Sequence, residues 1–426
     1  MRSNEKYKRK MCKENKGITL IVLVITIIVL LILAGVAIAA LSGDNGILTR
    51  AKEAKEKTEQ AQKEEEKTLS NMESILNNTS TFNNVNTEDT NPAGAMPTNV
   101  TILESDANKG IVIKDKNNNE WVWIEVPKIT VFSDLTIDTT GILTDKNYTD
   151  IKNKLITYAA TYRKGSATQS YNWTDEWYEG CGLTSEEYTT IYQKMLKSVY
   201  TYGGFWIARY EAGIEGSIED VSKARTEHTD ITIGTSPKAI SQKDAIPYNF
   251  IYCSEAQAIA KEMTPENNYT SSLMFGIQWD LVCKYLEVKG NLATADINSN
   301  STSWGNYENT KIENIISGKY AIYKNSALGT WTTIAGSYTK PNTSPDYDTI
   351  LSTGITDYTK KMNIYDFAGN EFEWTLEKAS ISYGHCANRG GYYGHTGSKY
   401  PTSYRSYYDT TIADRIVGFR TTLYVN

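Results

Sequence analysis

The longest uninterrupted apolar stretch of the chain lies close to its N-terminus. Residues 18–41 include no charged side chain, and Thr19 and Thr26 are the only polar ones. The 17 residues before this stretch carry seven Lys or Arg and two Glu. A helix of this length crosses a hydrocarbon core of about 30 Å, and basic flanks usually stay in the cytoplasm. The pattern predicts a transmembrane helix over 18–41 that leaves the rest of the chain outside.

Beyond this stretch the pattern changes to a helical stalk and then to a linker. Residues 47–77 are rich in Ala, Lys, Glu and Gln, which are good helix formers, and carry one thin apolar stripe at helical spacing. Residues 78–100 are rich in Asn, Thr, Ser, Gly and Pro, a composition that buries too little apolar area to fold. We therefore predict an anchor helix with its stalk over 18–77, a flexible linker over 78–100 and a globular domain over 101–426.

The globular part combines short strands, short helices and long loops. Residues 120–126 alternate as a strand does, and Pro127 ends the pattern. The other predicted elements are helices over 150–162, 184–200, 254–263 and 271–286 and a strand over 205–210. Loops rich in Asn, Ser, Thr and Gly, such as 291–302 and 336–350, separate these elements. The mixture predicts an α+β fold with much irregular loop.

Composition narrows the classes of partner. A net charge of -6 and a pI near 5.4 argue against nucleic acid, because phosphate binding needs a concentrated basic face. Tyr outnumbers Phe by thirty to eight, and its hydroxyl suits exposed contact surfaces. The cysteines are widely spaced and include no CxxC pair, so one or two disulfides and isolated buried thiols both stay open. They are Cys12, Cys181, Cys253, Cys283 and Cys386.

Tyrosine is concentrated near the C-terminus. Residues 392–414 hold six Tyr, four Thr, three Ser and two Gly, a composition close to that of antibody loops. Adjacent Tyr side chains in an extended chain point to opposite sides, so one ring of each pair is expected to face outward. Packing of the rings on the domain itself is the alternative. The predicted ligand-binding residues are Tyr392, Tyr393, His395, Ser398, Tyr400, Ser403, Tyr404, Ser406, Tyr407, Tyr408 and Asp409.

The N-terminus resembles the leader junction of type IV prepilins at Lys16-Gly17-Ile18-Thr19-Leu20-Ile21. In that family a peptidase cuts after the Gly and methylates the new N-terminal residue. The resemblance implies a prepilin-type leader over 1–17, cleavage after Gly17 and methylation of Ile18. Val22 stands where pilins usually have Glu, which favours a minor or tip subunit over a major one. A plain membrane anchor is the alternative.

Three motifs frame the tyrosine-rich segment, and further motifs precede them between Gly203 and Tyr307. The three are Gly369-Asn370-Glu371-Phe372-Glu373-Trp374, Arg389-Gly390-Gly391 and Gly418-Phe419-Arg420. In this order they resemble the formylglycine-generating-enzyme (sulfatase-modifying factor) superfamily, from about residue 121 to the C-terminus. The resemblance implies a C-type-lectin-like fold.

The resemblance extends to the fold more than to the activity. In the enzymes of that superfamily, two Cys after the Gly-Gly turn bind copper and activate oxygen. Here His395 and Tyr400 stand at those positions, and no Cys follows Cys386. Because that copper site needs soft thiolate ligands, we predict no enzymatic activity and no required cofactor. The resemblance also implies a structural Ca²⁺ held by oxygens of Asn370 and Glu373, with hydrogen bonds within the turn as the alternative.

Some lectin-fold members of this superfamily are targets of diversity-generating retroelements, which mutate adenines in C-terminal Asn-type codons. Such codons do not reach Lys, Glu, Gln, Met or Trp, and Lys399 is the only member of that set within 392–414. The segment is therefore a candidate for diversification. A near-identical DNA repeat beside a reverse transcriptase, differing only at adenines, is the expected genomic sign.

These features predict a surface-displayed, pilin-like anchored protein of the adhesin type, whose lectin-like head binds a glycan, a protein or a phage. The expected location is the cell surface or cell membrane, as a single-pass protein or in a pilus, with the C-terminal domain extracellular. Other pilin subunits are expected partners, and nucleic acid is not. The alternatives are a membrane-tethered enzyme of the formylglycine-generating type and a minor pilin without a ligand.

Overall fold

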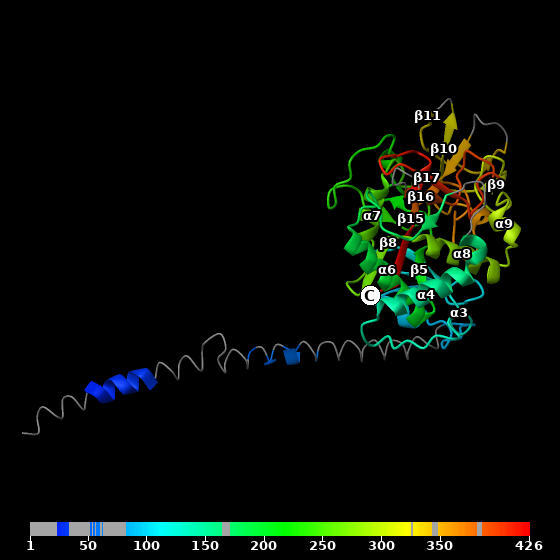
Figure 1. Ribbon diagram of the computed structural model, residues 1–426. Helices are drawn as coiled ribbons and strands as arrows, with labels where there is room; N and C mark the ends of the chain where they lie inside the picture. Colours follow the sequence, from blue (N-terminus) through cyan, green and yellow to red (C-terminus); the bar gives the residue numbers. More distant parts are fainter. Residues whose placement is uncertain are drawn as a thin grey trace, which may run out of the picture. The chain divides into compact units, whose positions relative to one another are not determined.

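Figure 1 shows the chain as a computed structural model. The structure describes residues 24–33, 52, 54, 55, 57–59, 62, 82–163, 171–324, 327–342, 348–380 and 386–426. The chain divides into two units, Met1–Ser74 and Ile75–Asn426.

Residues 24–33 of the first unit are helical, within the apolar stretch over 18–41. Among the residues that the structure describes, no helix combines the length and the apolar character that crossing a membrane needs. Gly17 and Ile18, the predicted processing site, lie outside the described residues. Membrane anchoring and pilin-like processing therefore stay predictions.

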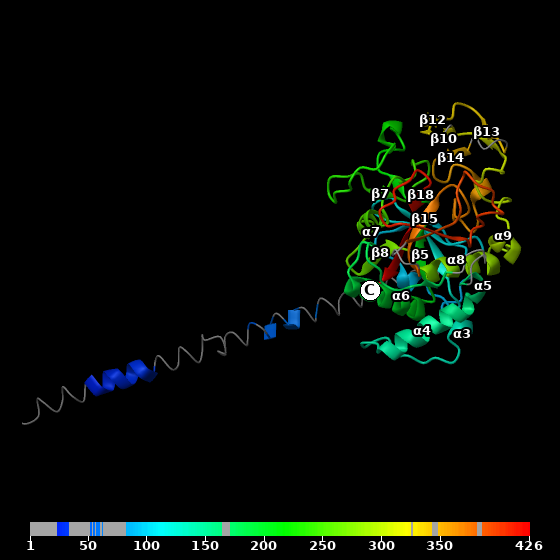
Figure 2. The ribbon, with the colours of Figure 1, turned by 45° about the horizontal axis from the view of Figure 1, so that its top comes forward.

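The second unit is built on a six-stranded antiparallel sheet in which the last strand of the chain pairs with two earlier ones. The strand order is β1 (Thr101–Glu104), β2 (Val112–Lys114), β3 (Glu120–Glu125), β5 (Gly204–Ala208), β19 (Thr421–Val425) and β8 (Tyr269–Leu273). Leu423 lies opposite Trp206 on one side and Ser271 on the other. Figure 2 shows the red C-terminal strand beside β5 and β8. The C-terminal strand β19 thus lies inside the sheet, between β5 and β8.

Helices pack against this sheet. Helix α6 (Ser185–Tyr202) contacts β5 and β19, and α8 (Gly276–Val288) contacts β3. A capping box between Thr184 and Glu187 starts α6, and Gly203 ends it in the left-handed conformation at φ 70°. The other helices are α3 (Lys128–Val131), α4 (Asp145–Tyr158), α5 (Ala160–Arg163), α7 (Cys253–Lys261) and α9 (Thr294–Asn298), with 3-10 turns at Ala93–Ala95, Val221–Lys223 and Asp357–Thr359.

A second sheet carries the tyrosine-rich segment. Its order is β17 (Arg405–Tyr408), β16 (Cys386–Arg389), β15 (Phe372–Ala379) and β18 (Val417–Phe419), and β4 (Trp173–Thr174) also pairs with β15. The β15–β18 pair is parallel, and the other pairs are antiparallel. The remaining strands are β6 (Gly213–Ile214), β7 (Ala239–Ile240), β9 (Ile312–Ile315), β10 (Lys319–Lys324), β11 (Ala327–Leu328), β12 (Thr332–Thr333), β13 (Tyr338–Lys340) and β14 (Asp348–Leu351).

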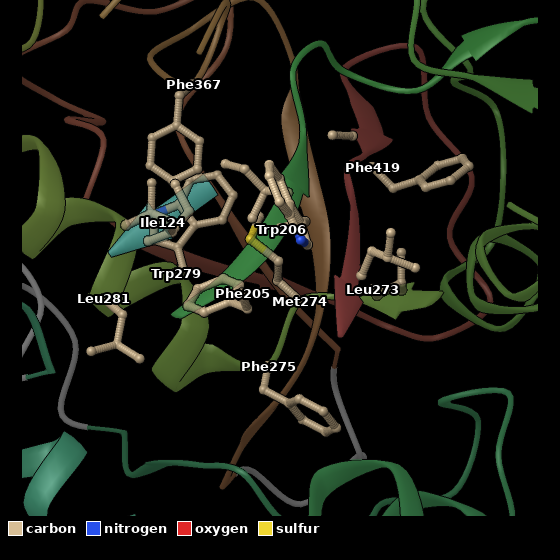
Figure 3. Packing of buried hydrophobic residues seen from close by; sticks show 14 of the residues in the cluster. Ile124, Phe205, Trp206, Leu273, Met274, Phe275, Trp279, Leu281, Phe367 and Phe419 are labelled. Carbon is tan, nitrogen blue, oxygen red and sulfur yellow. The ribbon is translucent and has the colours of Figure 1, made fainter. Parts of the chain in front are cut away.

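A large hydrophobic core joins the first sheet to the second. Figure 3 shows part of it, with Phe367 stacked on Trp279 at 4.1 Å between ring centroids. Gly204 permits close packing within the first sheet, because a Cβ there would lie 2.4 Å from the carbonyl oxygen of Ile124. The largest fully buried apolar side chains include Trp121, Trp123, Trp206, Trp279, Trp304 and Trp374.

A disulfide between Cys253 and Cys386 joins the start of α7 to the start of β16. Cys181 and Cys283 carry free, buried thiols, and burial raises the pKa of both. The cysteine spacing left both disulfides and isolated buried thiols open, and the described residues contain one disulfide and two buried thiols. Cys12 lies outside the described residues.

The linker predicted over 78–100 is wrong for residues 82–100, which pack on the domain. Ala95 is 1% exposed and belongs to the large core. The buried indole of Trp123 donates a hydrogen bond to Thr90 Oγ1 at 2.9 Å, and that of Trp206 donates to the carbonyl oxygen of Ala95 at 2.6 Å. The polar composition of this segment predicts a flexible linker, but it does not show that buried Trp side chains of β3 and β5 bind the segment through hydrogen bonds.

The helix predicted over 271–286 is wrong at its start, where β8 pairs with β19. Helix α8 begins only at Gly276, where the Gln278 side chain accepts a hydrogen bond from the backbone N–H of Phe275. The other predicted strands and helices are confirmed to within a few residues, except that α4 and α5 share the helix predicted over 150–162. Short elements also occupy the predicted loops, namely α9 within 291–302 and β13 within 336–350. The α+β class is confirmed.

Candidate functional site

The tyrosine-rich segment leaves the second sheet after β16, forms a loop over 390–404 and returns as β17. Gly391 has φ 77°, and a Cβ there would lie 2.3 Å from the carbonyl oxygen of Tyr400, so this turn requires glycine. The indole of Trp279 donates a hydrogen bond to the carbonyl oxygen of Thr402 at 3.0 Å. The core therefore fixes the path of this loop.

A buried cluster of six charged side chains holds β16 and β17 to α8 and β15. Arg405 Nη2 donates to Asp280 Oδ2 at 2.7 Å, and Arg389 Nη1 donates to Glu377 Oε2 at 3.0 Å. Burial would raise the pKa of Asp280, but the surrounding guanidinium groups hold it below its ordinary value. The charge cluster consists of Arg163, Arg389, Arg405, Asp175, Asp280 and Glu377. It contains three cations and three anions. This balance is needed because a buried charge without an opposite charge nearby is strongly destabilising.

One group of rings, the loop aromatic group, lies on the loop over 390–404 and on β15. It comprises Phe372, Tyr392, His395, Tyr400 and Tyr404. Phe372 is buried, and the half-buried Tyr392 and Tyr400 pack on it at 5.1 and 5.4 Å between centroids. Burial and the nearby Lys399 ammonium lower the pKa of His395, so its ring is neutral at pH 7. The group presents neutral, flat surface with hydroxyl groups.

A second group, the edge aromatic group, consists of Tyr171, Trp173 and Tyr407. The rings of Tyr171 and Tyr407 meet edge to face at 5.1 Å, and their hydroxyl oxygens are 3.2 Å apart. Successive strand residues point to opposite faces of a sheet. Tyr408 accordingly packs on Trp374, at 6.1 Å, rather than with this group. The segment's tyrosines are thus divided between the two faces of the second sheet.

Exposure separates the predicted binding residues into three sets. Ser398 is exposed. Half-buried are Tyr392, His395, Tyr400, Ser406, Tyr407, Tyr408 and Asp409. Tyr393, Ser403 and Tyr404 are only 1%, 0% and 7% exposed. The predicted direct contact is wrong for these three, because the loop folds back onto the core and turns them inward.

The Ca²⁺ ligands predicted from the resemblance have other partners. Asn370 Oδ1 accepts hydrogen bonds from Asn306 Nδ2 at 2.9 Å and from the backbone N–H of Leu351 at 3.0 Å. Glu373 Oε1 accepts from Arg420 Nη2 at 2.7 Å. Both side chains therefore hold the frame of the domain, and we no longer assign a Ca²⁺ to this pair. The alternative of hydrogen bonds within the turn is wrong for these side chains, because Asn306, Leu351 and Arg420 all lie outside residues 369–374.

Among the described residues, His228, Asp230 and Glu255 place possible ligand atoms within 4.8 Å of one another. The Glu255 carboxylate, however, accepts hydrogen bonds from the backbone N–H groups of Tyr252 and Ile231 at 3.0 Å each. The ring of His228 lies 3.9 Å from that of Tyr252. These contacts explain the cluster as a support for the start of α7, so we assign no metal to it.

Four buried carboxyl groups lie next to the frame motifs, and one of them, that of Glu373, accepts hydrogen bonds from Arg420 Nε and Nη2. The four groups belong to Glu211, Asp366, Glu371 and Glu373. Burial and the neighbouring carboxylates raise the pKa of Glu211 and Glu371 well above the ordinary value of 4.5. Glu371 Oε1 accepts a hydrogen bond from Asn249, whereas its Oε2 has no partner among the described residues. The folded chain therefore keeps protons that the unfolded chain releases.

This arrangement makes stability depend on pH. Because the folded pKa of Glu371 is raised, its contribution is present below about pH 4.5 and is lost as the pH rises through the folded pKa. We expect Glu371→Gln to raise the free energy of unfolding at pH 8, because the amide stays neutral without the proton that the buried carboxyl group has to keep. The gain should shrink at pH 5, and urea unfolding at both values measures it. The exposed Glu186→Gln is the control, and an equal gain there would contradict this account.

Sequence reasoning missed three contributors to the site. Tyr171 and Trp173 come from a segment more than 200 residues before Tyr407, and they reach it because β4 pairs with β15. Their only signal was the run of aromatic residues over 171–178. Arg415 directly follows the predicted segment, and its guanidinium lies 3.7 Å over the ring of Tyr323. Nothing in the local sequence pairs it with that ring.

No protein-family model matches this chain, and no curated protein matches it. Solved structures similar to it include the crystal structure of CarF, at 12% identity and a TM-score of 0.31, covering 53% of this chain and 87% of CarF. Treponema denticola variable protein 1 is similar at 11% identity and a TM-score of 0.28, covering 52% of this chain and 84% of that protein. Similarities at this level do not assign the chain to a family.

Proposed function

We propose that this chain binds an extracellular ligand, without turnover, through the half-buried rings of the loop and edge aromatic groups and Tyr408. The carrying observation is that these rings stand partly open to solvent, and that all of them except Tyr171 and Trp173 lie on a loop and strand fixed by the charge cluster. Tyr and Trp supply large contact area at low entropy cost. A fixed frame reduces the ordering that a ligand must impose.

The proposal places the domain outside the cell, anchored through residues 18–41 at the cell surface or cell membrane or carried in a pilus with other pilin subunits. The Cys253–Cys386 disulfide supports an extracellular domain, because such bonds persist in oxidising compartments. Binding is preferred to oxidation of the formylglycine-generating type. His395 and Tyr400 stand in place of the thiol pair, and the free thiols described, Cys181 and Cys283, are buried.

The test is binding of the purified full-length chain, in detergent micelles, to an array of immobilised glycans and proteins. Tyr392→Ser and Tyr407→Ser remove one ring from each aromatic group, and we expect at least one of them to weaken binding tenfold or more, about 1.4 kcal/mol. Tyr338→Ser is the matched control, since Tyr338 is also half-buried and stacks on Tyr320 at 4.0 Å, but in β13. We expect no change for it.

Each outcome has a distinct meaning. Equal binding by the wild type and both variants would show that these rings do not contribute to ligand binding. A wild type that binds nothing on the array would instead favour the minor pilin without a ligand. Comparison of Tyr392→Ser with Tyr407→Ser also tells which face of the second sheet makes the contact.

A further inference from the structure

A cavity of about 630 Å³ lies next to the tyrosine-rich segment and contains none of its predicted binding residues. Its walls come from the loop over 221–226, from residues 327–331, and from Phe250 and Arg415. This volume falls in the usual range for small-molecule sites. The described residues that line it are mostly apolar and include no carboxylate. Because these segments are far apart in the chain, sequence pattern gives no sign of the cavity.

Hydrogen bonds hold the walls of this cavity in place. Arg225 Nη2 donates to the carbonyl oxygens of Thr229 and Phe250 at 2.7 and 2.8 Å. The backbone N–H of Gly329 donates to the carbonyl oxygen of Ile322 at 2.8 Å, which ties the segment after β11 to β10. A ligand therefore meets walls that are already ordered, and this lowers the entropy cost of binding.

One buried indole that lines the cavity lacks a hydrogen-bond partner. The side chain of Trp331 is only 6% exposed and belongs to the large core. The six fully buried Trp side chains all donate their indole N–H, at 2.6 to 3.1 Å. Among the described residues, the N–H of Trp331 has no acceptor, and it is not one of the partnerless atoms that are closed off from solvent. The N–H is therefore accessible, and it opens into the cavity that Trp331 lines.

This donor and its surroundings limit the chemistry of a ligand. Buried indole N–H groups usually find a partner, so an open one marks a place for an acceptor. The guanidinium groups of Arg225 and Arg415 bring positive charge to the walls, which disfavours an amine. Val221 and Leu328 offer apolar surface. The ligand should thus combine a hydrogen-bond acceptor with an apolar group and carry no positive charge.

An acetamido group meets these requirements, because it has a carbonyl oxygen, a methyl group and no charge. The remaining polar side chains of the lining suit the hydroxyl groups of a sugar ring. They are Ser222, Thr226 and Thr330. From this combination we propose that the cavity binds a sugar that carries an acetamido group, with the Trp331 N–H donating to its carbonyl oxygen. The inference rests on the proposed ligand-binding function and names the ligand class.

Arg415 places the cavity close to the tyrosines. Burial raises the pKa of Tyr408 to about 12, and the charge of Arg415 partly counteracts this effect. Arg415 acts in the same direction on the pKa of Tyr392, which burial raises. Its charge therefore lies near both rings. A glycan of several units can place its acetamido sugar in the cavity and the next units on these rings.

The experiment compares methyl glycosides of N-acetylglucosamine, glucose and glucosamine, with the full-length chain in micelles. We expect N-acetylglucosamine to bind about tenfold more tightly than either other sugar. Trp331→Phe keeps a flat apolar ring but has no N–H, so it should remove this preference. Trp177→Phe is the matched control. It loses the N–H that donates to the carbonyl oxygen of Leu183 at 2.8 Å, but Trp177 does not line the cavity.

Ala327→Trp guards against a variant that simply misfolds. Ala327 is exposed on the cavity wall, so a larger side chain there fills the cavity without entering the core. We expect it to abolish binding of N-acetylglucosamine and to leave the urea unfolding midpoint unchanged. Equal binding of the three sugars would overturn the proposal, as would a preference that survives in both Trp331→Phe and Ala327→Trp.

The two proposals fail in different ways. If Tyr392→Ser or Tyr407→Ser loses array binding while the wild type shows no preference for N-acetylglucosamine, the cavity proposal fails and the proposed function stands. If both Tyr variants bind the array as the wild type does while Ala327→Trp loses N-acetylglucosamine, the cavity proposal stands and the role proposed for the rings fails.

Discussion

Glu377→Gln is expected to lower the free energy of unfolding by about 3–5 kcal/mol, the usual cost of breaking a buried ion pair. Glu377 accepts hydrogen bonds from Arg163, Arg389 and Arg405 at 3.0 Å each. The neutral amide leaves three buried cations with two anions, and its NH₂ group faces guanidinium donors where an acceptor is needed. Urea unfolding of the full-length chain, followed by tryptophan fluorescence, measures the loss.

The control for this variant is Glu313→Gln. Glu313 is also paired with a cation, Lys311, but its side chain is 59% exposed. Exposed pairs contribute about 0–1 kcal/mol, so we expect little change. Hydrogen exchange should also rise in the loop over 390–404 of Glu377→Gln, because the charge cluster holds both flanking strands. Similar losses in the two variants would contradict the role given to the cluster.

Local sequence predicts strands and helices of this domain, but not the long-range interactions that stabilise their packing. The strand over 120–126 and the helix over 184–200 follow from patterns of neighbouring residues, and both are confirmed, as β3 and α6. The charge cluster joins residues as far apart as Arg163 and Glu377, separated by 214 positions. One sequence contains no information on such pairs. From sequence alone, an Arg or Glu is predicted to be exposed, because its buried partner is known only once the fold is known.

The same limit applies to the site. Composition located the tyrosine-rich segment, but it could not tell which rings are buried. Tyr393 and Tyr404 are turned inward by contacts of the loop over 390–404 with distant residues; the backbone N–H of Tyr393, for example, donates to the carbonyl oxygen of Asn370 at 3.0 Å. Alternation along an extended strand applies to β17 alone, where Tyr407 and Tyr408 do face opposite sides.

The buried polar groups explain how a loop of this composition can be held still. Tyr, Ser, Thr and Gly alone would leave the segment free to rearrange, which a binding surface has to offset when it captures a ligand. Here the flanking strands are tied by charges on one face and by a disulfide at the start of β16. The stability of the frame therefore affects binding without any change in the contact rings. The disulfide permits the second large test of this relation.

Removal of the Cys253–Cys386 disulfide is expected to destabilise the domain by about 2–5 kcal/mol. The bridge spans 133 residues, and long bridged loops restrict the unfolded chain most. The double variant Cys253→Ala/Cys386→Ala removes both bridging cysteines, so it creates no new free thiol. Tyr178 loses its 2.8 Å contact with Cys386 Sγ but keeps the carbonyl oxygen of Thr375 within 3.4 Å, so few polar groups are orphaned. Urea unfolding with and without reductant measures the effect.

Cys283→Ala is the matched control, because it removes a thiol that is buried but bridges nothing. We expect it to cost about 1 kcal/mol, as typical core substitutions do. Reductant should lower the unfolding midpoint of the wild type and of Cys283→Ala, and leave that of the double variant unchanged. Equal midpoints for the wild type and the double variant without reductant would show that the bridge adds no stability. The charge cluster would then be what ties β16 to the core, and Glu377→Gln would be the variant that frees the binding loop.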